Sequence, residues 1–144
     1  YITLLGLLST IMTAAVPYCD VRKFSITDGL AANTISDLKQ GKDNLMWFST
    51  WNGLSFYDGY KFHTFRDNPD DIDVLSTNRI LKIEPSYNNN VWCITYDHQL
   101  YVYDTHFCQF FAVGQKFNEL FNIDLRVSQV YPMKNGATWF TSED

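Results

Sequence analysis

A tryptophan returns three times at a nearly constant interval along this chain, and this repeat restricts the possible folds more than any other feature. Trp47 and Trp92 lie 45 positions apart, and Trp139 follows 47 positions later. An apolar residue stands 12 positions before each tryptophan; these are Ile35, Ile80 and Val127. A fixed period of this size indicates one supersecondary unit used several times over.

Each unit has the pattern of four short strands. In the first unit we expect strands over about 34–39, 45–50, 54–58 and 61–66. Asn52-Gly53 and Asp58-Gly59 stand between apolar runs, which is a strong hairpin signal. Four antiparallel strands at a period of ~40–50 residues are typical of a β-propeller blade. The sequence therefore predicts an all-β fold made of propeller blades.

The number of units indicates an incomplete ring. Residues 24–144 hold about 2.7 units, whereas propellers close with roughly 4–8 blades. We expect blades at about 24–66 and 67–113 and a truncated third at 114–144, as the N-terminal part of a larger propeller. A β-sandwich is the alternative, but it would not predict a tryptophan at a fixed register.

The first residues differ from the rest of the chain. Ile2 to Val16 is almost wholly apolar, and small residues and Pro17 follow it. This order is typical of a secretory signal peptide more than of a spanning helix. No basic residue precedes the run, so we infer that the start of the natural chain is missing. We predict a truncated signal peptide over 1–19 and a partial propeller over 20–144; a membrane anchor or a core helix is the alternative for the leader.

Composition argues against several classes of function. The net charge is −5 and the 11 Lys and Arg residues are scattered, which argues against a nucleic-acid partner. The three cysteines have neither disulfide-framework nor zinc-site spacing. The acidic run 67–73 lacks the Gly and the distal Glu of a calcium loop. No nucleophile–base motif is present, so we expect no catalytic residue, metal or cofactor.

The residues themselves resemble a known family. FSITDGL at 24–30, NTI at 33–35, LMWFST at 45–50 and GLSFYDG at 53–59 are similar to the two-component regulator propeller repeat. The resemblance implies the periplasmic sensor of a hybrid two-component system, which would bind an oligosaccharide and signal to a histidine kinase outside this chain. It also implies an exported fragment without enzymatic activity, a parent protein in the inner membrane, and a homodimer. Two alternatives stay open: a propeller enzyme of the streptogramin-lyase type, and a propeller that only binds other proteins.

Blade topology predicts where a ligand would bind. Strands alternate in direction, so the turns after the second strand and the connections between blades share one face. That face receives Asn33, Trp51, Asn52, Asn78, Arg79, Tyr96, Asp97 and His98. Rings stack on the apolar face of a sugar and amides satisfy its hydroxyl groups, so we expect an oligosaccharide to contact these residues. The alternative is that Trp51 covers a blade edge and that Asn33 and Asn78 cap backbone groups.

Four further expectations concern packing and turns. The repeating tryptophans are predicted to lie in the core between blades. Residues 24–27 are expected to form an outer strand that closes the ring. The second unit has no counterpart of Gly53 between Tyr96 and Leu100, so its turn must have a different shape. The opposite face is expected to carry only turn-forming residues.

Overall fold

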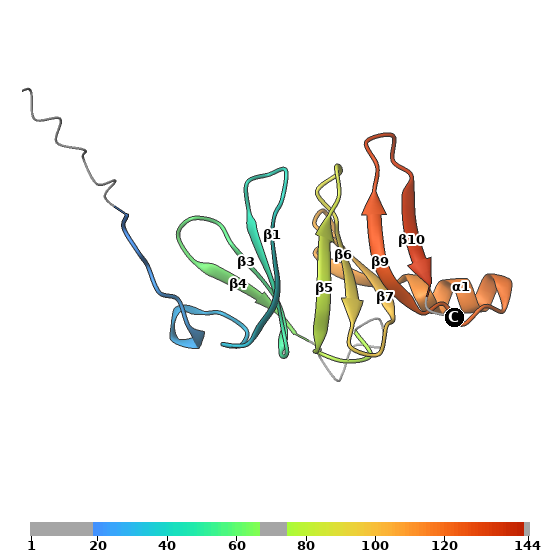
Figure 1. Ribbon diagram of the computed structural model, residues 1–144, viewed down its shortest axis with the longest axis horizontal. Helices are drawn as coiled ribbons and strands as arrows, with labels where there is room; N and C mark the ends of the chain where they lie inside the picture. The colour runs from blue at the N-terminus through green and yellow to red at the C-terminus, as the bar shows by residue number, and fades with distance from the viewer. Residues whose placement is uncertain (1–18, 67–74, 143–144) are drawn as a thin grey trace, which may run out of the picture.

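The computed structural model describes residues 19–66 and 75–142. Two four-stranded antiparallel sheets and one two-stranded sheet account for most of this part of the chain (Figure 1). The first sheet contains β1 (Ile35–Gln40), β2 (Met46–Thr50), β3 (Gly53–Tyr57) and β4 (Phe62–Phe65). The second contains β5 (Ile80–Pro85), β6 (Val91–Thr95), β7 (Leu100–Asp104) and β8 (Gln109–Ala112). The third contains β9 (Val127–Pro132) and β10 (Thr138–Ser142).

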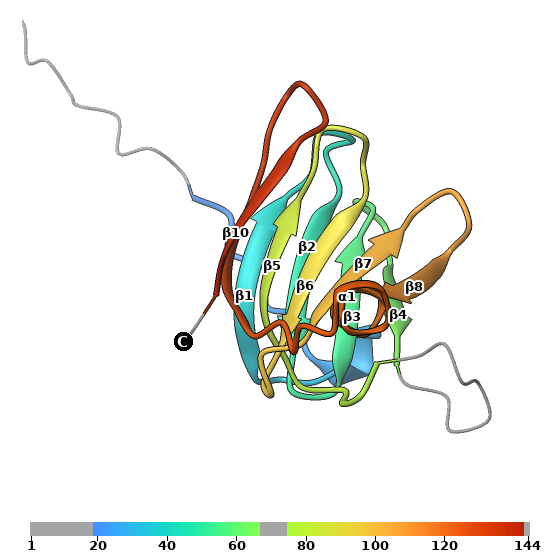
Figure 2. The same cartoon turned by 90° about the vertical axis from the view of Figure 1, so that its right-hand side faces the viewer.

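The three sheets stack face to face, as propeller blades do (Figure 2). The strand order in each follows the chain, so every neighbouring pair is a hairpin. The first strand of each blade packs against the first strand of the next, β1 on β5 and β5 on β9. The predicted all-β blade architecture is confirmed, and the expected strands of the first unit lie within one or two residues of the observed ones. The predicted signal peptide and acidic run lie, except for residue 19, outside the described residues.

The repeat extends to the backbone geometry of the first hairpin in each blade. In all three blades the register between the first two strands shifts near the start of the first strand, at Ile35, Ile80 and Val127. The turns that join these strands also share one pattern of hydrogen bonds, in which the N–H of the first turn residue donates to the carbonyl of the fifth. The three first residues are Gly41, Ser86 and Met133. The sequence period therefore reflects one backbone unit used three times.

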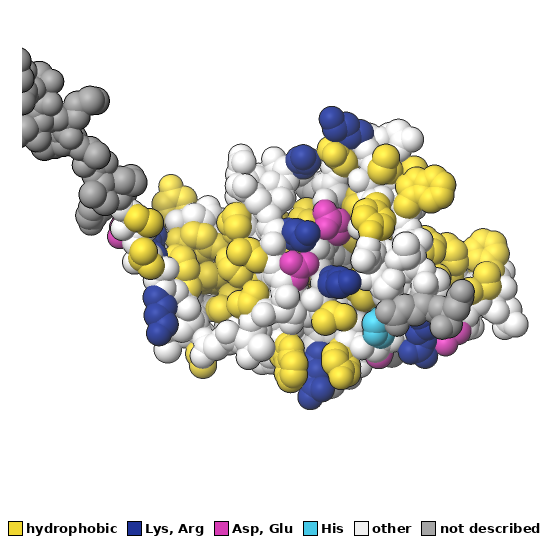
Figure 3. All heavy atoms as spheres, viewed as in Figure 1, with side chains coloured by type: hydrophobic (Ala, Val, Ile, Leu, Met, Phe, Trp, Pro, Cys, Tyr) yellow, Lys and Arg dark blue, Asp and Glu magenta, His cyan; other side chains and the backbone are white. Residues whose placement is uncertain are grey.

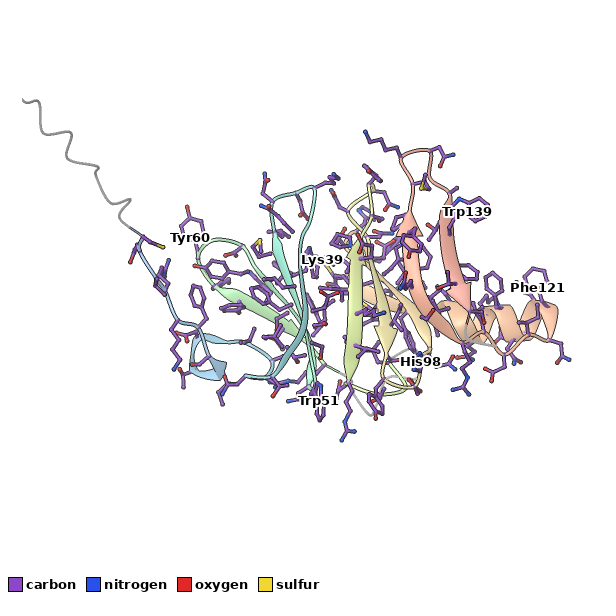
Figure 4. The ribbon with its side chains drawn as sticks, viewed as in Figure 1. Lys39, Trp51, Tyr60, His98, Phe121 and Trp139 are labelled. Atoms are coloured by element: carbon purple, nitrogen blue, oxygen red, sulfur yellow. The ribbon has the colours of Figure 1, made fainter. Side chains whose placement is uncertain are left out.

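The repeating tryptophan is buried to a different degree in each blade. Trp47 is 1% exposed and its ring lies 5.8 Å from that of Tyr103, on the second blade. Trp92 is half-buried and packs beside the cluster between the second and third blades. Trp139 is 69% exposed (Figure 4). The prediction of a core position is confirmed for Trp47 and is wrong for Trp139, because no sheet among the described residues covers the face on which Trp139 lies.

A helix that the strand pattern did not predict lies between the second and third blades. α1 (Val113–Phe121) follows β8 directly and packs against β7. Phe117 points inward and makes an edge contact with Phe140 of β10 at a centroid distance of 5.8 Å. Leu120 and Phe121, at the end of the helix, are more than half exposed, and the ring centroid of Phe121 lies 5.4 Å from that of Phe117. No helix in the described part of the chain is long and apolar enough to span a membrane.

The segment before β1 lies against the first blade and is not a strand. Residues Ile26–Asp28 form a short 3-10 helix, which Ser25 caps. Phe24 packs on Tyr57 and Phe62, with ring centroids 5.0 and 5.3 Å away. Residues 24–27 are thus not a strand in this structure, because the side chain and N–H of Ser25 both bond to Asp28, which favours a tight turn. Their pairing with the final blade of a closed ring stays a prediction.

Candidate functional site

The predicted ligand face lies at one end of the three stacked blades. The turns after β2 and β6 meet there with the connections that lead into β1 and β5. Figure 4 shows Trp51 and His98, which come from two different blades, along this lower edge. The residues that sequence reasoning selected thus lie along one side of the molecule, but they differ in what their side chains contact.

Three of the candidate residues form a stack that bridges the first two blades. The guanidinium carbon of Arg79 lies 5.4 Å from the ring centroid of Trp51 and 5.9 Å from that of Tyr96. Both distances are within the range of cation–π attraction. Trp51 is 54% exposed and Tyr96 is 59% exposed, and Arg79 is exposed as well. In Figure 3 a basic side chain flanked by two hydrophobic ones projects from the lower edge.

Backbone hydrogen bonds fix the loops that carry this stack. The N–H of Gly53 donates to the carbonyl of Asn78 at 2.8 Å, which ties the turn of the first blade to the start of the second. The N–H of Tyr96 donates to the carbonyl of Arg79 at 2.9 Å. Trp51 lies two residues from the first of these bonds and Tyr96 itself makes the second, so the stack is preorganised.

The stack combines two kinds of recognition chemistry. The planar guanidinium has five N–H donors, and stacking on aromatic rings leaves its edges available for hydrogen bonds. Each exposed ring also presents apolar surface that can cover the C–H face of a sugar. An aromatic surface beside a fixed cluster of donors suits a polyhydroxylated ligand, whose hydroxyl groups need partners when they leave water.

Two predicted amides have partners within the fold. The side-chain oxygen of Asn33 accepts the N–H of Ile26 at 3.0 Å and so holds the 3-10 helix in place. The amide nitrogen of Asn52 lies 3.4 Å from the carbonyl of Ala31. These contacts agree with the alternative given above, in which loop amides serve the backbone. Asn78 contributes its carbonyl to the bond with Gly53.

Asp97 and His98 shape the second turn. The carboxylate of Asp97 accepts hydrogen bonds from Thr95 at 2.6 Å and from Ser76 at 3.0 Å. Partial burial disfavours the charged form, but these hydrogen bonds outweigh it and lower the pKa of the Asp97 carboxyl. His98 has a left-handed backbone, with φ 62°, where the first blade has Gly53 with φ 118°. The expected difference between the two turns is confirmed.

A second set of polar residues lines the inner strands, and sequence reasoning did not select it. A hollow of about 210 Å³ lies between β1, β5 and β9. Lys39 and Glu84 form an ion pair of 3.2 Å across it, and Asp37 accepts the N–H of Ile83 at 3.2 Å. The sequence pattern that could have indicated this set is the presence of charged residues at alternate positions of β1 and β5. No cluster of three or more His, Cys, Asp or Glu side chains suited to a metal occurs among residues 19–66 and 75–142.

Comparisons with known proteins agree with this architecture. The family model described as "Two component regulator propeller" matches residues 29–52. Histidine kinase P4 of Formosa agariphila is 34% identical over 55 residues, which is 38% of this chain and 4% of that protein. A crystal structure of the extracellular domain assigned to a hybrid two component system of B. thetaiotaomicron aligns with a TM-score of 0.60 and 24% identity, over 85% of this chain and 16% of that one.

The family-model match confirms the resemblance of the first blade to the two-component regulator propeller repeat. The chain spans only a small part of both relatives. The structural alignment supports the propeller fold, and the match to the family model covers β1, β2 and the turn that carries Trp51.

Proposed function

We propose that this chain belongs to the extracytoplasmic sensor of a hybrid two-component signalling protein, and that the sensor binds an oligosaccharide. The observation that carries the proposal is the stack of Arg79 between Trp51 and Tyr96, which is exposed and yet fixed by backbone bonds. The match of the first blade to the regulator propeller family supports the signalling context. The histidine kinase named among the relatives supports a kinase as the output.

In this proposal the chain acts only by binding. Its partners are the saccharide, the remaining blades and domains of the parent protein, and a second copy of the sensor. The parent is exported to the periplasm and anchored in the inner membrane, and residues 1–19 serve as its signal peptide. A ligand bound at the stack would contact two blades at once, because Trp51 comes from the first blade and Arg79 and Tyr96 come from the second. A ligand could thereby change the fit between blades and pass its presence on.

The test is saccharide binding by the whole sensor. Defined tri- and tetrasaccharides are screened on a glycan array, and those retained are measured by calorimetry. Trp51→Ala and Arg79→Gln are each expected to weaken binding at least tenfold, or about 1.4 kcal/mol, because one loses the stacking surface and the other its donors. Tyr60→Ala is the control, since Tyr60 is 93% exposed and belongs to a turn at the other end of the blade.

Two results would contradict the proposal. Retention of no saccharide by the wild-type sensor would reject sugar sensing. Unchanged affinity in both stack variants, with a saccharide bound, would remove this surface from the site.

A further inference from the structure

The opposite face of the blades carries a row of side chains at one repeated turn position. The second residue of the turn between the first two strands is Lys42 in the first blade, Tyr87 in the second and Lys134 in the third. All three turns have the same hydrogen bonds and a left-handed fourth residue, which is Asn44, Asn89 or Gly136. The row therefore follows from the repeat itself.

This turn position is not needed to close the turn. The third residue of the turn stabilises it instead: the side-chain oxygens of Asp43, Asn88 and Asn135 each accept the N–H of the residue two positions later. The second residue is left to project from the surface. The acidic group nearest to Lys42 in sequence is the carboxylate of Asp43. One oxygen of that carboxylate accepts the N–H of Leu45 at 3.1 Å.

The two lysines converge on the tyrosine between them. The ammonium nitrogen of Lys42 lies 4.8 Å from the ring centroid of Tyr87, and that of Lys134 lies 6.0 Å from it. Tyr87 is 45% exposed. Figure 3 shows basic side chains with a hydrophobic one between them along the upper edge. Two positive charges thus meet at one ring on a chain whose net charge is −5.

Tyr87 and Lys134 also border two hollows. One, of about 270 Å³, lies between the second and third blades and has Trp92, Val102 and Met133 in its lining, with Asn88 and Asn90 on its polar side. The other, of about 370 Å³, is shallower and is shared by Met133 and Asn135. The first is slightly smaller than the roughly 300–1,000 Å³ of pockets for drug-sized ligands, so it suits a single sugar ring with neighbouring residues outside.

We propose that this row, which we call the Lys-Tyr-Lys row (Lys42, Tyr87 and Lys134), is a second binding site, for an acidic saccharide that carries carboxylate or sulfate groups. The tyrosine ring and the apolar lining cover the C–H face of a sugar, and the amides beside them meet its hydroxyl groups. The two ammonium groups pair with its anionic substituents. This site lies on the end of the blades opposite Trp51 and does not depend on that stack.

The test is calorimetry on the whole protein with two acidic probes, a trisaccharide of galacturonic acid and a sulfated disaccharide, and a neutral trisaccharide of galactose for comparison. We expect at least one acidic probe to bind, with an affinity that falls as salt rises. The double variant K42Q/K134Q should weaken that binding at least tenfold, and Tyr87→Ala should weaken it several-fold. Lys61→Gln is the matched control, because it removes one exposed lysine from the same end of the first blade.

Circular dichroism establishes that each variant is folded before its affinity is interpreted. Failure of both acidic probes to bind the wild-type protein would overturn the inference, and so would K42Q/K134Q binding within twofold of wild type. The last measurement tests whether vesicles that contain phosphatidylglycerol retain the protein. Retention of the protein by these vesicles through the two lysines, with no acidic saccharide bound, would assign the row to a membrane surface and overturn the saccharide site. Trp51→Ala leaves the Lys-Tyr-Lys row intact. Loss of binding at the stack can therefore be distinguished from loss of binding at the row.

Discussion

The two junctions between blades use the same strand positions and are filled differently. Between the first and second blades, Trp47 is enclosed by rings, with Phe56 at 4.9 Å and Tyr103 at 5.8 Å between centroids. Between the second and third, Trp92 is only half-buried and lines both the inner hollow and the hollow below Tyr87. The first junction is filled by the larger core cluster, which includes Trp47 and Tyr103, whereas the second combines a smaller core with polar hollows.

This difference shows that a repeated sequence position does not have one fixed role. The same tryptophan is core in the first blade, a cavity wall in the second and surface in the third, according to what covers it. We therefore expect the first junction to contribute more to stability, whereas the second has room for a ligand. Substitutions at matched positions of different blades test this division.

The largest contrast is expected between Trp47→Ala and Trp139→Ala in this chain. Trp47 is 1% exposed, and loss of a buried tryptophan costs ~3–5 kcal/mol of unfolding free energy. Trp139 is 69% exposed, and its removal should cost less than about 1 kcal/mol. Urea unfolding followed by circular dichroism measures both values. Equal losses would show that the exposed face of the third blade is covered in solution.

A smaller contrast is expected between the two turns that follow β2 and β6. Gly53 has φ 118°, and a Cβ there would lie 2.2 Å from the carbonyl oxygen of Phe65. We therefore expect Gly53→Ala to cost ~2–4 kcal/mol. Gly59→Ala is the control for backbone strain alone, because its Cβ would meet nothing within 4 Å. It should cost about 1 kcal/mol.

His98→Gly tests the same position in the second blade. His98 is left-handed without being glycine, so the substitution relieves strain and should leave thermal stability unchanged or slightly higher. A marked loss of stability would mean that the His98 side chain contributes more than its backbone conformation. Thermal unfolding of the two variants side by side gives the comparison.

The smallest expected effect is on pH dependence. Asp58 and Asp104 occupy matching turns after the third strand, and each carboxylate accepts two backbone N–H groups. The N–H of Lys61 is the largest influence on Asp58, and with His63 at 2.8 Å it holds the pKa of that carboxyl well below its usual value. The N–H of Phe107 has the same effect on the pKa of Asp104.

A carboxyl group whose pKa is lowered by folding stabilises the protein above its unfolded pKa, about 3.9, and this contribution is lost as pH falls further. Asp58→Asn should therefore lower the melting temperature at neutral pH, and its difference from wild type should shrink below pH of about 4. Asp104→Asn should do the same to a smaller extent, because the second oxygen of Asp104 has only the amide of Asn90 at 3.3 Å, where that of Asp58 has His63 at 2.8 Å. A constant difference across this range would rule out the carboxylate charge as the cause.

The repeat made most of the fold predictable. Trp47 and Ile35 recur with their neighbours at a fixed period, and hairpin signals such as Asn52-Gly53 delimit the strands, so blade architecture follows from local pattern. α1 was not predictable in this way, because it follows β8 without a polar break and Ala112 provides no side-chain cap. Its place depends on the contact of Phe117 with Phe140, which is a property of packing between blades.

The candidate site was predictable in position but not in chemistry. Topology placed Trp51, Arg79 and Tyr96 on one face, and the structure brings them together. Topology did not show that Asn33 is bonded to the 3-10 helix, since that contact depends on how the preceding segment folds back. The opposite face was expected to be simple turns. The grouping of Lys42, Tyr87 and Lys134 appears only when three turns from different parts of the chain lie side by side.

The burial of Trp47 against Tyr103 has a consequence for how the protein is made. The partner ring lies 56 positions later in the chain, so the first blade exposes its tryptophan until most of the second blade has emerged from the ribosome. Each new blade then shields the one synthesised before it and presents a new exposed ring of its own. Assembly in this order always leaves the outer face of the newest blade uncovered, and we expect a chaperone to bind there during synthesis.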